Sequence, residues 1–167
     1  MKFMTPSRRL VVAAALATMA MPTLAATATS TFQVNGTVVA TCSVSATALN
    51  FGASIPTPVN SNIDATSTIT ATCSNSVPFS VALNAGNGVG ATVITRKMSS
   101  GPNAVDYAMY TDAGRTNVWG DGTPGSSVNT LTGTGAAQAI PVYGRIPTGQ
   151  TPAIGIYSDT ILVTLTF

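Results

Sequence analysis

The chain has 167 residues, a formal net charge of +2 at pH 7 and no His. Without His there is no Ser-His-Asp catalytic triad, and the commonest side chain for metal binding and proton transfer is missing. Only 7% of the residues are charged and 45% are hydrophobic, which excludes an intrinsically disordered chain and leaves no basic patch for nucleic acid.

Residues 1–25 predict a cleaved secretory signal peptide. Lys2, Arg8 and Arg9 form a positive n-region, residues 10–20 form an apolar h-region, and Thr23-Leu-Ala25 supplies small residues for cleavage. The alternative, a membrane anchor, needs ~20 apolar residues, and this run is shorter. Removing the segment leaves about 142 residues with four cations and five Asp, a net charge of −1. We therefore expect export to the periplasm.

The rest of the chain is rich in Thr, Val, Ser and Gly and has no Glu, a composition that favours strands over helices. Short runs of strand-forming residues alternate with Gly, Pro and Asn, which is typical of a single β-sandwich domain with Greek-key connections. We expect strands at residues 32–44, 66–73, 79–83, 91–98, 105–110, 117–119, 137–145 and 156–167.

The last predicted strand alternates apolar residues with Thr. Ile161, Val163, Leu165 and Phe167 share one face, as in a half-buried strand. The terminal carboxylate therefore lies on an aromatic residue whose position in the pattern predicts burial. Such an end is either inserted into a core or held out for a partner to bind.

A second alternating segment precedes the first Cys. Phe32, Val34, Gly36 and Val38 share one face, and the residues between them are mostly polar. One hypothesis is a strand that binds a groove on another molecule. The alternative is that Asn35-Gly36 forms a type I′ turn that folds the segment onto its own domain.

Two cysteines, Cys42 and Cys73, remain in the exported chain, where an even pair predicts a disulfide. Closing this loop would contribute roughly 3–4 kcal/mol on the chain-entropy model. The alternative, a metal or redox pair, lacks His, a third Cys and CxxC spacing.

We expect no enzyme active site, no cofactor and no metal. Asp106, Asp112, Asp121 and Asp159 lie near predicted turns or strand edges, where Asp is ordinary turn chemistry. Trp119 and the tyrosines leave open a sugar-binding surface, although packing in the core is the expected role of such residues.

Several motifs, taken in order, resemble the spore coat protein U domain family, which includes the pilins of archaic chaperone–usher pili. The Cys pair flanks Asn50-Phe-Gly52, and the C-terminal third holds the most specific motifs. These are Tyr107-Ala-Met-Tyr-Thr-Asp112, Trp119-Gly120, Pro141-Val-Tyr-Gly-Arg-Ile146 and Gly155-Ile-Tyr-Ser-Asp-Thr160, followed by the strand to Phe167.

The resemblance implies an all-β, incomplete immunoglobulin-like sandwich whose last strand is supplied in trans. A periplasmic chaperone would fill the groove first, and the N-terminal segment of a neighbouring pilin would replace it at the outer-membrane usher. On this basis residues 26–40 are the donor segment, with Phe32, Val34, Gly36 and Val38 facing the groove, and residues 41–167 are the domain. The acceptor edge and chaperone anchor are Ile161, Val163, Leu165 and Phe167.

The expected function is therefore a structural pilus subunit at the cell surface, supporting attachment and biofilm formation. The first alternative is a spore or cell-surface coat protein with the same domain. A tip adhesin and a secreted carbohydrate-binding adhesin centred on Trp119 are the others; a tip adhesin normally carries a further receptor-binding domain.

Overall fold

The structure is a computed structural model that describes residues 25–167, so the predicted signal peptide lies outside the described residues except for Ala25. The chain divides into two units, Met1–Thr37 and Val38–Phe167. In the first unit, the described residues 25–37 are extended and exposed and belong to no strand. Residues 25–167 contain no helix that is long and apolar enough to cross a membrane.

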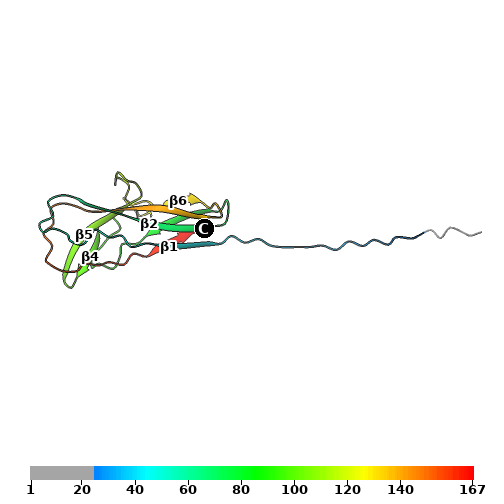
Figure 1. Ribbon diagram of the computed structural model, residues 1–167, viewed down its shortest axis with the longest axis horizontal. Coiled ribbons are helices and arrows are strands. Elements are labelled where there is room, and N and C mark those ends of the chain that lie inside the picture. The colour runs from blue at the N-terminus through cyan, green and yellow to red at the C-terminus, as the bar shows by residue number, and fades with distance from the viewer. Residues whose placement is uncertain (1–24) are drawn as a thin grey trace, which may run out of the picture. The chain divides into compact units, whose positions relative to one another are not determined.

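The second unit is an all-β domain (Figure 1). Most of its strands occupy runs with apolar residues at alternate positions, which is the pattern that one buried face requires. The strands are β1 (Cys42–Ala46), β2 (Ile63–Cys73), β3 (Pro78–Leu83), β4 (Arg96–Ser100), β5 (Asn103–Tyr110), β6 (Asn129–Thr132), β7 (Ala137–Ile146) and β8 (Val163–Thr166).

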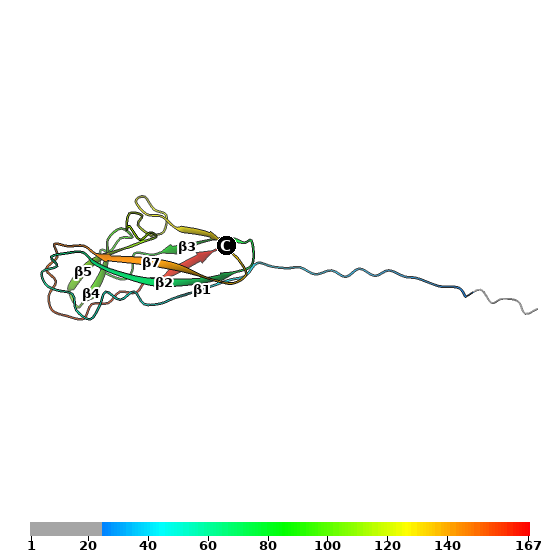
Figure 2. The same ribbon diagram turned by 45° about the horizontal axis from the view of Figure 1, so that its top comes forward.

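The strands form two sheets that enclose one core. One sheet has five strands in the order β1-β2-β7-β5-β4, and the other has three in the order β6-β3-β8. All strand pairs are antiparallel. The chain crosses between the sheets after β2, β3, β5, β6 and β7, and in Figure 2 β3 and β8 lie behind the long β2–β7 pair. The predicted sandwich is confirmed.

The core is built from the inward-facing positions of both sheets. In β3 every second residue is buried, and β2, β5 and β7 supply the opposite layer. The central residues are at most 5% exposed: Ile69, Ala71, Phe79, Val81, Leu83, Val105, Tyr107, Met109, Ile140 and Val142.

The strand predictions were right for most of the chain and wrong in five places. The predicted strand 91–98 begins only at Arg96, and the predicted strand 117–119 forms only isolated bridges, from Val118 and Trp119. Residues 32–44 were expected to be one strand, but only Cys42–Ala46 is paired. The predicted strand 156–167 shortens to Val163–Thr166, and β6 was not predicted because Asn-Thr-Leu-Thr carries one apolar residue. Residues 32–41 belong to no strand, and in residues 156–162 only Ser158 pairs, through an isolated bridge to Ser99 of β4. A full strand requires a continuous partner edge.

Candidate functional site

Strands β1 and β8 are one edge strand of each sheet; β4 and β6 are the other two edge strands. Among the described residues β1 pairs only with β2, and β8 pairs only with β3. The two strands nevertheless lie next to each other, as the red β8 beside β1 shows in Figure 1. Each therefore presents a row of backbone N–H and C=O groups that no strand of residues 25–167 satisfies.

The core-facing residues of β1 are uncovered although their neighbours are buried. Val44 pairs with Ala71, and directly paired residues lie on the same face of a sheet. Ala71 is fully buried, whereas Val44 is 37% exposed. The next pair along, Ala46 and Ile69, repeats the contrast, with Ala46 exposed and Ile69 buried. The core is therefore covered beside β2 and uncovered beside β1.

Strand β8 shows the same contrast from the other sheet. Val163 pairs with Leu83 and Leu165 pairs with Val81. Both β3 residues are at most 1% exposed, whereas both β8 residues are only partly buried. Phe167, which the alternation placed on the buried face, lies just beyond β8 and is 58% exposed. The pattern was wrong about its burial because no strand in the described chain covers that side of β8.

A cavity of about 660 Å³ lies between these two edges. One wall is the segment from Ala46 to Gly52, which continues from β1, and the other is the segment from Tyr157 to Val163, which leads into β8. Core side chains of both sheets form the floor: Ile69, Leu83, Met98, Tyr107, Met109 and Val142. We call this cavity the acceptor groove.

Polar contacts hold the β8 wall of the acceptor groove. The Asp159 carboxylate accepts hydrogen bonds from the Tyr107 hydroxyl and from the Asn87 backbone N–H, both at 2.7 Å. The Leu162 backbone N–H donates to the Asn84 side chain at 2.9 Å. Burial, with this hydrogen bond to Asp159, raises the pKa of Tyr107, so its hydroxyl remains a donor. This role of Asp159 was not predicted, because its partners are 52 and 72 residues away along the chain.

The opposite side of the sandwich is closed by Arg96 and Trp119, and we call it the closed seam. The Trp119 indole N–H donates to the Val81 carbonyl at 2.8 Å. The Arg96 guanidinium donates to the carbonyls of Leu83, Asn84, Val93 and Trp119. Both side chains are fully buried, and burial lowers the pKa of Arg96. Trp119 is thus a core residue, which contradicts a sugar-binding surface centred on it.

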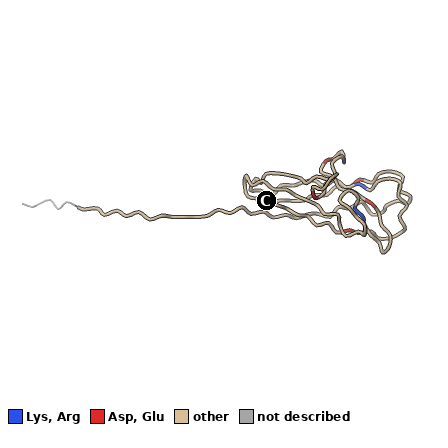
Figure 3. The backbone as a smooth tube through the Cα atoms, turned by 180° about the vertical axis from the view of Figure 1, so that it is seen from behind, with Lys and Arg blue, Asp and Glu red and all other residues tan. Residues whose placement is uncertain are grey.

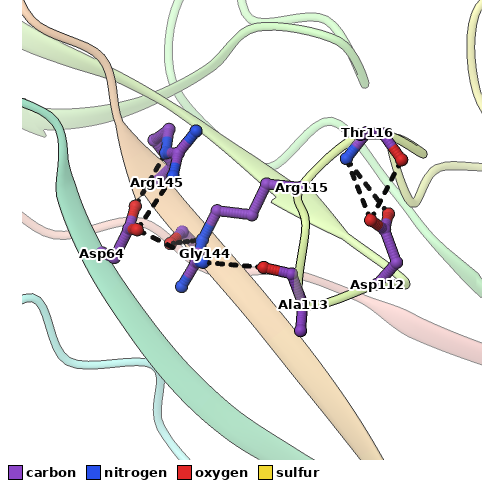
Figure 4. Close-up of polar contacts among 7 residues, drawn as sticks. All are labelled: Asp64, Asp112, Ala113, Arg115, Thr116, Gly144 and Arg145. Carbon is purple, nitrogen blue, oxygen red and sulfur yellow. Dashed lines mark hydrogen bonds and ion pairs between the residues drawn. The ribbon is translucent and has the colours of Figure 1, made fainter.

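The outer face of the five-stranded sheet carries an ion-pair network (Figure 4). Asp64 on β2 binds Arg145 on β7 through two hydrogen bonds of 2.7 and 2.8 Å, and Arg115 lies 3.2 Å from the same carboxylate. The bond from Arg145 holds the pKa of Asp64 below its usual value. Arg115 also donates to the Gly144 carbonyl, so the network fastens the loop after β5 to the sheet.

Charged residues are unevenly distributed over the domain. Figure 3 places them in the half away from the C-terminal residue. Asp112 and Asp121 accept hydrogen bonds from their own loops, from Thr116 and Asn117 and from Thr123 respectively. Residues 25–167 contain no group of three His, Cys, Asp or Glu residues arranged to hold a metal ion.

The predicted disulfide between Cys42 and Cys73 is confirmed. The two residues are directly opposite each other in the β1–β2 pair, with Cα atoms 4.1 Å apart. The bond fastens the beginning of the edge strand β1 to β2, so it supports one wall of the acceptor groove.

The predicted donor residues lie in exposed, extended chain. Phe32, Val34 and Val38 are 87%, 83% and 98% exposed, and residues 25–40 belong to no strand or turn. The type I′ turn at Asn35-Gly36 is therefore not formed. Large apolar side chains are seldom left in water at three alternate positions without a partner, so this row is a second unusual apolar feature of the chain.

Comparison with known proteins identifies the family. The family model described as "Spore Coat Protein U domain" matches residues 28–164. This chain belongs to the Spore Coat Protein U domain family. It is 33% identical over 160 residues to Protein U of Myxococcus xanthus, an alignment that covers 87% of this chain and 88% of that protein. The resemblance inferred from the Tyr107–Asp112 and Gly155–Thr160 motifs is confirmed.

A solved structure shares the fold of this Spore Coat Protein U domain. It is the CsuC–CsuE chaperone–tip adhesion subunit pre-assembly complex from the archaic chaperone-usher Csu pili of Acinetobacter baumannii. The match has a TM-score of 0.54 and 24% identity, and it covers 78% of this chain and 40% of the solved chain. It shows that the β-sandwich fold of this domain also occurs in a chain of that complex.

Proposed function

We propose that this Spore Coat Protein U domain is a structural pilus subunit that polymerises by donor-strand complementation. In this mechanism, residues 32–38 of one copy enter the acceptor groove of the preceding copy, between β1 and β8. One observation carries the proposal: inward-facing residues on both edges are uncovered although their paired neighbours are buried. A single strand placed between the edges would cover both rows.

The donor segment has the chemistry that the groove needs. Its backbone would pair with the free edges of β1 and β8, which gives affinity without dependence on side chains. Phe32, Val34 and Val38 would enter the apolar groove, and each burial would contribute roughly 1.5–3 kcal/mol. Gly36 has no side chain and suits a point where the backbone passes close to the groove floor.

The proposal includes an export chaperone and an outer-membrane usher as partners. An uncovered apolar groove with two open sheet edges promotes aggregation, so the subunit needs temporary cover after export. The solved pilus complex with this fold contains a chaperone bound to a subunit, which supports such a partner. We assign the chaperone contact to the edge formed by Ile161, Val163, Leu165 and Phe167, and we place the assembled fibre on the cell surface, where it supports attachment and biofilm formation.

A matched pair of substitutions in the donor segment tests the mechanism. Val34→Asp places a carboxylate on the face directed into the groove, whereas Thr37→Asp places the same charge on the opposite face. We expect electron microscopy to show fibres from wild-type and Thr37→Asp chains and none from Val34→Asp chains. Equal assembly of both variants would contradict the donor assignment, as would fibres from a chain that lacks residues 26–38.

A second candidate function is a spore or cell-surface coat protein. The family description names spore coat, and the Myxococcus xanthus relative aligns over most of its length. Electron microscopy of cells with and without the gene distinguishes the two, because a pilus gives extended fibres and a coat gives a continuous layer. The same Val34→Asp variant then shows whether a coat also depends on strand donation.

A further inference from the structure

The chain contains two Asn-Gly pairs in contrasting surroundings. Asn35-Gly36 lies in the donor segment, and Asn87-Gly88 lies in the loop after β3. Asn-Gly is the dipeptide in which Asn most readily reacts with its own backbone, because Gly has no Cβ to obstruct the attack. The structure decides which of the two pairs is free to reach the reactive geometry.

The reaction consumes one water and releases one ammonia, with no oxidant or reductant. The deprotonated backbone nitrogen of Gly36 attacks Cγ of Asn35 and forms a C–N bond. The Cγ–Nδ2 bond then breaks, and ammonia leaves a five-membered succinimide ring. Water opens the ring at either carbonyl, which gives aspartate when the new bond to Gly36 breaks and isoaspartate when the original peptide bond breaks.

Asn35-Gly36 is unconstrained in the subunit. Both residues are exposed and lie in neither a strand nor a turn, and no hydrogen bond joins either of them to residues 25–167. A Cβ built on Gly36 would have no atom within 4 Å. The backbone therefore rotates freely into the geometry in which the Gly36 nitrogen meets Asn35 Cγ.

Asn87-Gly88 is held on both sides. The Asn87 N–H donates to the Asp159 carboxylate at 2.7 Å, and the Gly88 carbonyl accepts from the Ala91 N–H at 3.0 Å. Gly88 also packs so closely on the Lys97 backbone carbonyl that a Cβ there would overlap it. This loop must open before the ring forms, so its reaction is slowed by the free energy of opening.

We propose that Asn35-Gly36 is a spontaneous modification site of the unassembled subunit, and that insertion into a neighbour's acceptor groove protects it. Protection by insertion rests on the proposed function. A strand placed between β1 and β8 has a partner edge on each side, so the Gly36 N–H is paired whichever way the strand runs. Pairing fixes the backbone and removes the nitrogen from reaction.

The two products differ in their effect on donation. Isoaspartate routes the main chain through one additional carbon, which shifts Phe32 and Val34 out of phase with Val38. A strand with that break cannot place all three side chains in the groove, so an isoaspartate subunit loses donor function. Aspartate keeps the spacing and places its charge on the same outward face as Thr37, so an aspartate subunit still donates. Isoaspartate formation in subunits outside the fibre thereby reduces the number of unassembled subunits that can donate a strand.

Peptide mapping of the exported chain tests the modification site. The purified chain is incubated at mildly alkaline pH, and isoaspartate is quantified at both Asn-Gly pairs by mass spectrometry after isoaspartyl methyltransferase labelling. We expect Asn35 to react at least about tenfold faster than Asn87, which corresponds to about 1.4 kcal/mol of loop opening. Equal rates at the two pairs, or no reaction at Asn35, would contradict the proposed modification site. The variant Asn35→Gln provides the unreactive control.

A second measurement tests protection and separates it from the proposed function. Fibres and unassembled chains from one preparation are incubated side by side, and Asn35 conversion is compared. Slower conversion in fibres supports protection, and equal conversion overturns it. If no fibres form, the proposed function fails, while the peptide map still decides whether Asn35 is the reactive pair. Asn35→Asp chains should assemble like wild type. If they do not assemble, the loss of donor function cannot be assigned to isoaspartate alone.

Discussion

The two sides of this sandwich differ in how the gap between the two sheets is covered. At the closed seam, Trp119 and Arg96 fill the gap between the sheets and satisfy five backbone carbonyls with side-chain donors. At the acceptor groove, β1 and β8 leave their backbone edges free and expose Val44 on the core side. The core side chains beneath both are at most 5% exposed, apart from the partly buried Met98 of the groove floor.

The contrast assigns subunit stability to the closed seam and strand binding to the acceptor groove. Buried side chains with satisfied hydrogen bonds stabilise the isolated subunit at the closed seam. The groove instead reserves apolar burial and backbone pairing for an incoming strand. Substitutions on the two sides should therefore differ both in size and in their response to a donor.

The largest effect on stability is expected at the closed seam. Trp119→Ala removes a fully buried indole and its hydrogen bond to Val81, and should lower the free energy of unfolding by about 3–5 kcal/mol. Chemical denaturation of the disulfide-intact chain measures it. A loss below about 1 kcal/mol would show that the closed seam is not a rigid part of the core.

Removing the disulfide should have the next largest effect. The double variant Cys42→Ser, Cys73→Ser frees the beginning of β1 and should lower the free energy of unfolding by roughly 3 kcal/mol. Because β1 leads into one wall of the acceptor groove, the variant should bind a synthetic peptide of residues 26–40 more weakly. Unchanged peptide affinity would show that the disulfide does not support the acceptor groove.

A Val→Ala pair compares the two environments directly. Val81→Ala, at a fully buried position of β3, should cost about 2 kcal/mol, whereas Val44→Ala, partly exposed on β1, should cost less than about 1 kcal/mol. With excess donor peptide, the cost of Val44→Ala should rise toward that of Val81→Ala, because the peptide covers the same face. A cost that does not change with peptide would mean that the strand inserts elsewhere.

The smallest effect is electrostatic and lies on the outer face of the sheet. The folded pKa of Asp64 is below its ordinary value, so its stabilisation is complete above about pH 4 and is lost as pH falls through the lowered pKa. This carboxylate is exposed at the surface, so the contribution should stay below about 1 kcal/mol. Asp64→Asn should flatten the acid limb of the unfolding curve slightly, and an unchanged curve would show that the Asp64 network adds nothing.

Much of the fold was predictable because it depends on local pattern. The alternation in residues 66–73, 79–83, 105–110 and 137–145 located four central strands, and the lone Cys pair identified the disulfide. Strand β6 escaped prediction because its four residues include only one apolar side chain. The alternation of residues 32–38 predicts an apolar face, but these residues belong to no strand of the described chain.

The site was only half predictable. The sequence pointed to Val163 and Leu165, because their alternation is visible along the chain. The residues that shape the groove from the other sheet, including Tyr107 with its bond to Asp159, were not foreseen as its parts. The sequence does not indicate that Arg96 is buried, because its burial follows from four carbonyls that converge on it from separate segments.

The sequence by itself determined the family, the β-sandwich and the two alternating segments, since periodicity and composition are properties of neighbouring residues. Only the tertiary structure decided which edges stay open and which seam is closed. That decision depends on which strands become neighbours across the two sheets, and antiparallel partners such as β3 and β8 are about 80 residues apart along the chain. The acceptor groove exists because those long-range pairings leave β1 and β8 with one partner each within the described chain.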